Sequence, residues 1–161
     1  MISLTVIIIC FICILVLISY IADDSRKKKT KISFKESMDL TELPVITFYN
    51  KDQKLNFLLD TGSNISHLTS SILPSLEFDY INKEMPTIGM EGNKVTSKFC
   101  RMTVQYKNQK YEEEFSISNL DNAFNIVKQE SGVQIHGILG SKFFEKYKYI
   151  LDFSELIAYT K

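Results

Sequence analysis

Hydrophobic positions follow one pattern at the N-terminus of the chain and another in the rest. Residues 2–22 are apolar almost without interruption and carry no charge. A helix rises about 1.5 Å per residue, so a helix over this stretch would cross the roughly 30 Å hydrocarbon core of a bilayer. The remaining sequence contains short apolar runs of strand length, separated by polar turns. The pattern predicts a transmembrane anchor over residues 1–22, followed by a strand-rich domain.

A cleaved signal peptide is the alternative interpretation of the apolar stretch. Such a peptide has a basic flank before a shorter apolar run, and small residues at the cleavage site. Here no Lys or Arg precedes the run, and Tyr20 stands where cleavage after Ala22 would require a small residue. These features favour an uncleaved, single-pass membrane anchor.

Basic residues follow the apolar stretch on its C-terminal side. They are Arg26, Lys27, Lys28, Lys29 and Lys31, after Asp23 and Asp24. Lysine and arginine are enriched on the cytoplasmic side of membrane spans, so we expect the C-terminal part to be cytoplasmic. Residues 23–42 are expected to form a polar juxtamembrane linker.

The apolar runs predict an all-β domain with small helices over residues 43–161. Strand pairs are expected from residues 43–49 with 54–60, 94–107 with 110–118, and 148–153 with 156–160, and a further short strand from 65–69. Helical segments are expected over residues 70–76, 119–130 and 141–147, the second with Ala123, Ile126 and Val127 facing inward. Residues 32–161 hold 14 Lys and Arg against 17 Asp and Glu, a net charge of −3. This charge argues against a nucleic-acid partner.

One apolar strand ends in a carboxylate. Leu58 and Leu59 lead into the run Asp60, Thr61, Gly62, Ser63 and Asn64. Asp, Gly, Ser and Asn all favour tight turns, so the run alone is compatible with ordinary turn chemistry. A second element changes the balance: Ile138 and Leu139 lead into Gly140 and a predicted helix, as in a strand that passes very close to another backbone.

The two elements together resemble the retropepsin-like aspartic proteases, single-domain relatives of pepsin. The Asp60, Thr61, Gly62 and Ser63 run resembles the catalytic loop, and the Ile138, Leu139 and Gly140 run resembles the strand that packs behind it. The resemblance covers residues 43–160, and its C-terminal part is similar to the bacterial members. It implies an all-β retropepsin-like acid protease half-barrel with short helices, acting as an aspartic endopeptidase on protein or peptide substrates.

A single Asp-Thr-Gly run occurs in the chain. Asp152 is followed by Phe153 and Ser154, so we interpret it as a turn residue. An enzyme of this family needs two carboxylates in one site, and the resemblance therefore implies a homodimer with its twofold axis through the site.

The resemblance also implies roles within the catalytic loop. The Gly62 amide would reach the Asp60 carboxylate, Thr61 would bond across the dimer, and Ser63 would bond the outer carboxylate oxygen. No cofactor and no metal are implied, and His67 and His136 have no partners at ligand spacing.

A candidate flap lies within residues 86–95. Gly89 and Gly92 flank Met90 and Glu91, at the place where the family carries a hairpin that closes over the substrate. An ordinary hairpin turn is equally compatible with these residues. A further alternative concerns the whole protein: a catalytically silent binding or dimerisation module at the membrane, which the intact motif around Asp60 disfavours.

Overall fold

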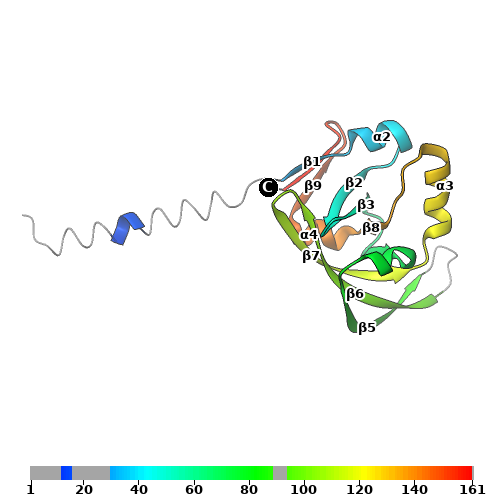
Figure 1. Cartoon of the computed structure of the whole chain (residues 1–161). Coiled ribbons are helices and arrows are strands. Elements are labelled where there is room, and N and C mark those ends of the chain that lie inside the picture. The colour runs from blue at the N-terminus through cyan, green and yellow to red at the C-terminus, as the bar shows by residue number, and fades with distance from the viewer. Residues whose placement is uncertain (1–11, 16–29, 89–93, 161) are drawn as a thin grey trace, which may run out of the picture.

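Strands make up most of the chain from Thr30 onward (Figure 1). The computed structural model describes residues 12–15, 30–88 and 94–160. The elements are β1 (Lys31–Ser33), α2 (Lys35–Thr41), β2 (Val45–Asn50), β3 (Gln53–Leu59), β4 (Ser66–Thr69), the 3₁₀ helix η1 (Ser70–Ser75), β5 (Asp79–Ile88), β6 (Lys94–Tyr106), β7 (Gln109–Ser118), α3 (Asp121–Ser131), β8 (Gly137–Leu139), α4 (Ser141–Tyr147), β9 (Tyr149–Asp152) and β10 (Ile157–Thr160).

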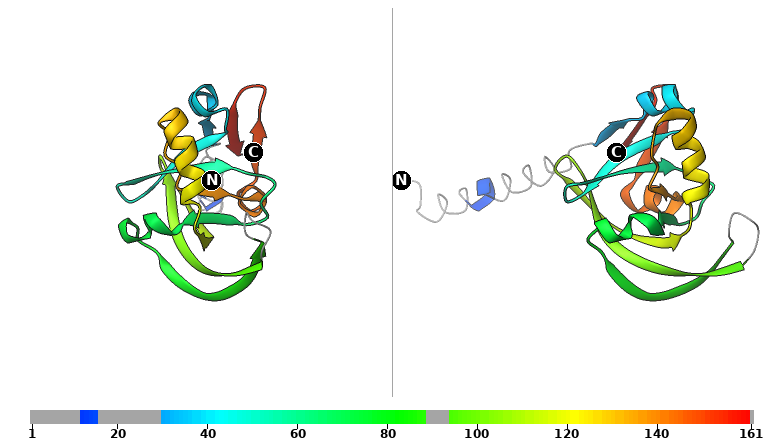
Figure 2. Two further views of the ribbon diagram at one scale, coloured as in Figure 1. Left: turned by 90° about the vertical axis from the view of Figure 1, so that its right-hand side faces the viewer. Right: turned by 45° about the vertical axis from the view of Figure 1, so that its right-hand side comes forward.

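The strands form two sheets. The larger has the order β2-β3-β8-β4-β7-β6-β5, and β2 also pairs with β6 through Tyr49 and Gln105, which closes six of its strands into a barrel. The smaller sheet has the order β1-β10-β9. It lies with α2 at the opposite end of the molecule from β5, and α3 lies along one flank (Figure 2). The predicted all-β class with short helices is confirmed.

Aromatic side chains fill the barrel. Phe48, Phe57, Phe115 and Phe143 are all fully buried. The Phe57 and Phe115 rings stack with centroids 5.5 Å apart. Burying each such ring contributes about 1.5–3 kcal/mol, because apolar surface leaves water. Since Phe57 is on β3 and Phe115 is on β7, this packing holds together strands that are distant in sequence.

The elements predicted from residue 43 onward are confirmed, apart from one helix face. In α3 the buried side chain is Phe124, which packs near Val45 and Ile135, while Ile126 is 58% exposed. The prediction that Ile126 faces inward is therefore wrong. Successive helical positions rotate by about 100°, so Phe124 and Val127 share a face from which Ile126 is turned away.

The folded domain begins before the predicted boundary at residue 43. Within the expected linker, β1 pairs with β10, and Ile32 and Phe34 are only 2% and 1% exposed. The two ends of the domain are also joined, because the Thr160 amide donates to the Thr30 carbonyl at 3.0 Å and the Thr30 amide donates to Thr160 Oγ1 at 3.0 Å. Apolar residues at alternate positions explain the extra strand: Ile32 on β1 and Phe34 directly after it are both buried in the core, although basic residues surround them in the sequence.

The predicted anchor over residues 2–22 lies outside the described residues except for 12–15, which are helical. In the part of the chain that the structure describes, no helix is both long enough and apolar enough to cross a membrane.

Candidate active site

Asp60 stands at the end of β3, where the strand turns out of the barrel. Its neighbour Leu59 pairs with Leu139 of the parallel strand β8, and the Asp60 amide donates to the Leu139 carbonyl at 3.1 Å. Asp60 is half-buried, while Thr61 and Gly62 are exposed. The apolar part of β3 therefore fixes the backbone of Asp60 in the core and presents its carboxylate at the surface.

The turn after Asp60 holds one oxygen of the carboxylate. The Gly62 amide donates to Asp60 Oδ1 at 2.8 Å, as the family resemblance implied. A Cβ at position 62 would lie 3.0 Å from the same oxygen, so a side chain there would crowd the carboxylate. Among the described residues, no other hydrogen-bond donor reaches the Asp60 carboxylate.

Ser63 is placed differently from the role that the resemblance implied. Its hydroxyl donates to the Ile65 carbonyl at 2.7 Å rather than to Asp60. The physical reason is local: a Ser side chain readily satisfies a backbone carbonyl two residues further along the chain in a tight turn. In this chain Ser63 therefore stiffens the loop and does not contact the carboxylate.

The residues Ile138, Leu139 and Gly140 lie directly behind the Asp60 loop, as predicted. A Cβ on Gly140 would lie 2.3 Å from the Ile65 carbonyl oxygen, which is closer than any side chain allows. The next residue adds a backbone bond, because the Ser141 amide donates to the Ser63 carbonyl at 2.8 Å. The expectation of a very close backbone approach at Gly140 is confirmed.

His67 lies near the loop on β4. Its Nδ1 is 3.3 Å from Ser118 Oγ. Burial lowers the pKa of His67, and the negative charge of the nearby Asp60 carboxylate opposes this shift. His67 is therefore close enough to Asp60 for the charge of the carboxylate to act on it. Among the described residues, no group of three or more His, Cys, Asp and Glu side chains is arranged to hold a metal ion.

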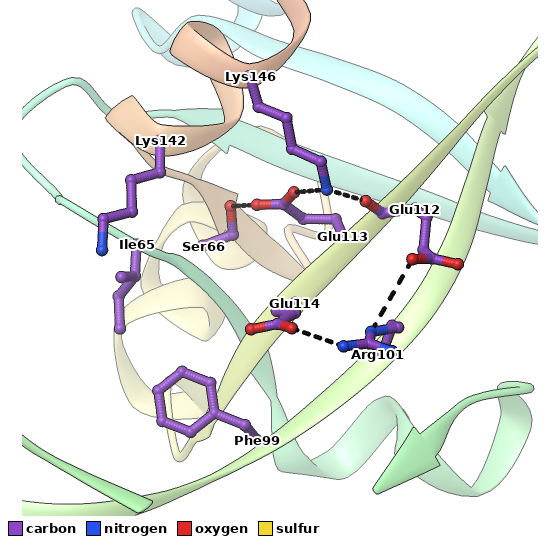
Figure 3. A pocket seen from close by; sticks show the side chains of 9 residues that line it. All are labelled: Ile65, Ser66, Phe99, Arg101, Glu112, Glu113, Glu114, Lys142 and Lys146. Carbon is purple, nitrogen blue, oxygen red and sulfur yellow. Dashed lines mark hydrogen bonds and ion pairs between the residues drawn. The ribbon is translucent and has the colours of Figure 1, made fainter. Parts of the chain in front are cut away.

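A pocket of about 210 Å³ opens beside the loop (Figure 3). Ile65 and Ser66 line it from the loop side, and Glu113 and Lys146 line it from β7 and α4. Ser66 Oγ donates to Glu113 Oε1 at 2.9 Å, and Lys146 Nζ lies 3.5 Å from Glu113 Oε2. Burial raises the pKa of Glu113, against the stabilising effects of Ser66 and Lys146.

Sequence reasoning did not identify Ser66 or Glu113. A signal was present in β7, where Tyr111, Glu113 and Phe115 occupy alternate, inward-facing positions. A carboxylate in the middle of such a series is unusual, since an unpaired buried charge is costly. That alternation could have singled out Glu113.

The candidate flap residues Gly89, Met90, Glu91 and Gly92 lie outside the described residues. The flanking strands β5 and β6 pair as far as Ile88 and Lys94. The predicted hairpin is thus formed, and the role of its tip stays a prediction.

Asp152 is confirmed as a turn residue. It ends β9, and its Oδ1 accepts hydrogen bonds from the Ser154 hydroxyl at 2.6 Å, the Ser154 amide at 3.0 Å and the Glu155 amide at 3.1 Å. These bonds lower the pKa of Asp152, the Ser154 hydroxyl most of all.

Comparisons with known proteins identify the family of the chain. The chain is similar to a retropepsin-like aspartic protease from Rickettsia conorii, at 18% identity and a TM-score of 0.48, over 82% of this chain and 91% of that one. It is also similar to EIAV protease in complex with the inhibitor HBY-793, at 20% identity and a TM-score of 0.45, over 67% of this chain and 90% of that one. No curated protein sequence matches it. The sequence profile of the aspartyl protease family matches residues 46–143, which include both Asp60 and Gly140. The resemblance noted in the sequence is thereby confirmed, and the chain belongs to the aspartyl protease family.

Proposed function

We propose that this protein is a membrane-anchored aspartic endopeptidase, active as a homodimer that places one Asp60 from each chain in a shared site. The observation that carries the proposal is the Asp60 turn: a half-buried carboxylate with one oxygen held by the Gly62 amide and its backbone braced by Gly140. The chain has one Asp-Thr-Gly run, and the other strand-end carboxylate, Asp152, has its Oδ1 engaged by three donors in its own turn. A second catalytic carboxylate therefore has to come from a second chain.

The chemistry follows from two carboxylates held close together. Both cannot be ionised at low cost, so one keeps a proton while the other is charged. The charged carboxylate takes a proton from a water molecule, and the resulting nucleophile attacks the carbonyl carbon of the peptide bond. The protonated carboxylate donates a hydrogen bond to the carbonyl oxygen. The leaving amine then takes a proton from the pair as the carbon–nitrogen bond breaks, which completes hydrolysis without a covalent enzyme intermediate.

The loop geometry suits this task. The Gly62 amide is fixed on Asp60 Oδ1, so it orients the carboxylate before substrate binds. Correct orientation of a catalytic group removes part of the entropic cost of reaching the transition state. The backbone bonds of Asp60 and Ser63 to β8 and α4 keep this orientation rigid.

Membrane anchoring is supported by the apolar residues 2–22 and the basic residues after them. The domain extends at least as far back as Thr30, so at most residues 23–29 separate it from the proposed span. We place the domain on the cytoplasmic side, following the basic residues. A reporter fused after Lys161 should therefore behave as cytoplasmic in a topology assay, and reporter activity on the opposite side would overturn this orientation.

The proposed activity is tested with the full chain in detergent micelles and a mixed peptide library, with cleavage followed by mass spectrometry. Asp60→Asn should lower the cleavage rate by about 10²- to 10⁴-fold, because an amide cannot exchange a proton with water as the carboxylate pair does. Sedimentation should show that the variant still dimerises. Asp152→Asn is the matched control, since it removes a carboxylate from a similar turn.

The outcomes separate the two functional hypotheses. Cleavage by wild type and by Asp152→Asn, with loss in Asp60→Asn, supports the endopeptidase. A wild-type dimer that cleaves no peptide would favour the silent binding module instead. Full activity in Asp60→Asn would exclude an aspartic protease mechanism.

A further inference from the structure

Three hydrogen bonds connect the Asp60 loop to the segment that braces it. The Asp60 amide donates to the Leu139 carbonyl, and the Ser141 amide donates to the Ser63 carbonyl. Between them, the Gly140 amide donates to Ser66 Oγ at 3.3 Å. The outer two bonds join backbone to backbone and are independent of side-chain identity. The middle bond depends on the orientation of one hydroxyl group.

That hydroxyl has a second partner on another strand. Ser66 Oγ donates its hydrogen to Glu113 Oε1 at 2.9 Å. A serine hydroxyl has one hydrogen and two lone pairs. When the hydrogen points at Glu113, a lone pair is available for the Gly140 amide. An acceptor at position 113 therefore holds the Ser66 hydroxyl in the orientation in which it accepts from Gly140.

The position of Glu113 is costly for a carboxylate. Its residue is 6% exposed, and Ser66 is 1% exposed. Tyr111 and Phe115 occupy the neighbouring inward positions of β7, and both are apolar core residues. Replacing a buried ion pair with well-packed apolar residues is often neutral or stabilising, so stability alone gives a weak reason for a charge here. Lys146 supplies the countercharge from α4 and keeps the carboxylate an acceptor (Figure 3).

We infer that Ser66 and Glu113 are positioning residues for the Asp60 loop: Glu113 orients the Ser66 hydroxyl, which in turn holds the Gly140 amide and the braced backbone behind Asp60. This inference rests on the proposed function in treating Asp60 as the catalytic group. Neither side chain touches the reacting atoms, so both act through the backbone. The prediction is a loss in kcat with little change in KM, because misplacement of a catalytic group slows the chemical step more than it weakens binding.

The experiment compares four variants of the full chain in detergent micelles. Glu113→Gln keeps an acceptor oxygen without the charge, Glu113→Met removes the acceptor at similar length, and Ser66→Ala removes the hydroxyl. Glu112→Met is the matched control, since Glu112 is the exposed neighbour of Glu113 on β7. Two quantities are measured: kcat and KM on a peptide that wild type cleaves, and the hydrogen-exchange rate of the Gly140 amide by NMR.

The expected pattern is specific. Glu113→Met and Ser66→Ala should each speed Gly140 exchange and lower kcat by about tenfold, as expected when a buried hydrogen bond is lost. Glu113→Gln should stay within about threefold of wild type, because its amide oxygen still accepts the Ser66 hydrogen. Glu112→Met should match wild type in both measurements.

Two results would overturn the inference. One is wild-type Gly140 exchange in Glu113→Met; the other is a Glu113→Gln variant as impaired as Glu113→Met, which would assign the effect to charge instead of hydrogen-bond acceptance. If Glu113→Met fails to fold, the comparison of Glu113→Gln with Ser66→Ala still decides, since only the second should speed exchange. Gly140 exchange is measurable whether or not the protein cleaves peptides. Failure of the proposed function is therefore distinguishable from failure of the inferred roles of Ser66 and Glu113.

Discussion

The turns at Asp60 and Asp152 have similar local chemistry and different surroundings. In each, a strand ends in an aspartate whose Oδ1 accepts the amide of the residue two positions later. Asp60 accepts that one bond, whereas Asp152 Oδ1 takes two more from its own turn. Behind Asp60 lies the backbone of Gly140, while the Asp152 turn is an exposed hairpin connection between β9 and β10.

The two aspartates therefore differ in how much of the carboxylate is engaged by hydrogen bonds from its own turn. Asp152 stabilises its own turn, because its carboxylate accepts hydrogen bonds from Ser154 and Glu155. Asp60 has its backbone fixed by distant segments, so its carboxylate does not have to serve the turn. The run from Asp60 to Ser63 therefore differs from an ordinary turn because the segment containing Gly140 packs behind it.

The largest expected effect comes from substituting Gly140, whose backbone packs closely against the Asp60 loop. Gly140→Ala would put a methyl group 2.3 Å from the Ile65 carbonyl oxygen, so the loop or β8 has to move. We expect the free energy of unfolding to fall by about 3 kcal/mol, as for an overpacked core, and cleavage to be lost. Chemical denaturation and a peptide cleavage assay measure the two effects.

Gly132→Ala is the matched control for that substitution. Gly132 ends α3 with a φ of 77°, and a Cβ there would meet nothing within 4 Å. The left-handed backbone alone should cost about 1 kcal/mol, with cleavage retained. Equal effects of the two substitutions would contradict the idea that close packing behind Asp60 is special.

An intermediate effect is expected on dilution, because the proposed site at Asp60 would need a second chain and the Asp152 turn would not. In micelles, specific activity should fall about in proportion to protein concentration once dimers dissociate. In vesicles at a fixed protein-to-lipid ratio it should stay constant, since the proposed anchor would keep the chains at high effective concentration. Activity assays over a dilution series, with sedimentation of the micellar form, test this; a fully active monomer would rule out the shared site.

The smallest effect is expected at Asp152. Its folded-state pKa is lowered, so it stabilises the protein above its unfolded pKa, and this contribution disappears as the pH falls through the folded value. Asp152→Asn should therefore melt slightly earlier than wild type at pH 7, and the gap should close in acid. Thermal melts across a pH series measure it. A gap that widened in acid would show that the sign of the linkage is wrong.

The loop at Asp60 and its brace at Gly140 were predictable from the sequence because both have local signatures: a strand running into turn residues, and an apolar pair running into glycine. Their contact was predictable only through the family resemblance, since β3 and β8 are far apart along the chain. The contact of Ser66 with Glu113 was missed for the same physical reason: β4 and β7 pair in parallel, and no local pattern reveals that pairing.

Two other differences have local causes. The strand at residues 31–33 was hidden because basic residues flank its buried Ile32. The face of α3 was misjudged because Phe124, and not Ile126, contacts the core beside Ile135. Side-chain spacing defines a helix face, and the tertiary partner decides which face is buried.

The pairing of Thr30 with Thr160 has a mechanical consequence. Both ends of the domain lie at the same end of the antiparallel pair β1 and β10, in which Lys31 is opposite Tyr159. A force between the proposed membrane span and the C-terminus would therefore unzip this pair one hydrogen bond at a time, instead of loading all of its bonds together in shear. Pulling the chain from its C-terminus against the proposed anchor should therefore separate β1 from β10 before the rest of the domain is loaded.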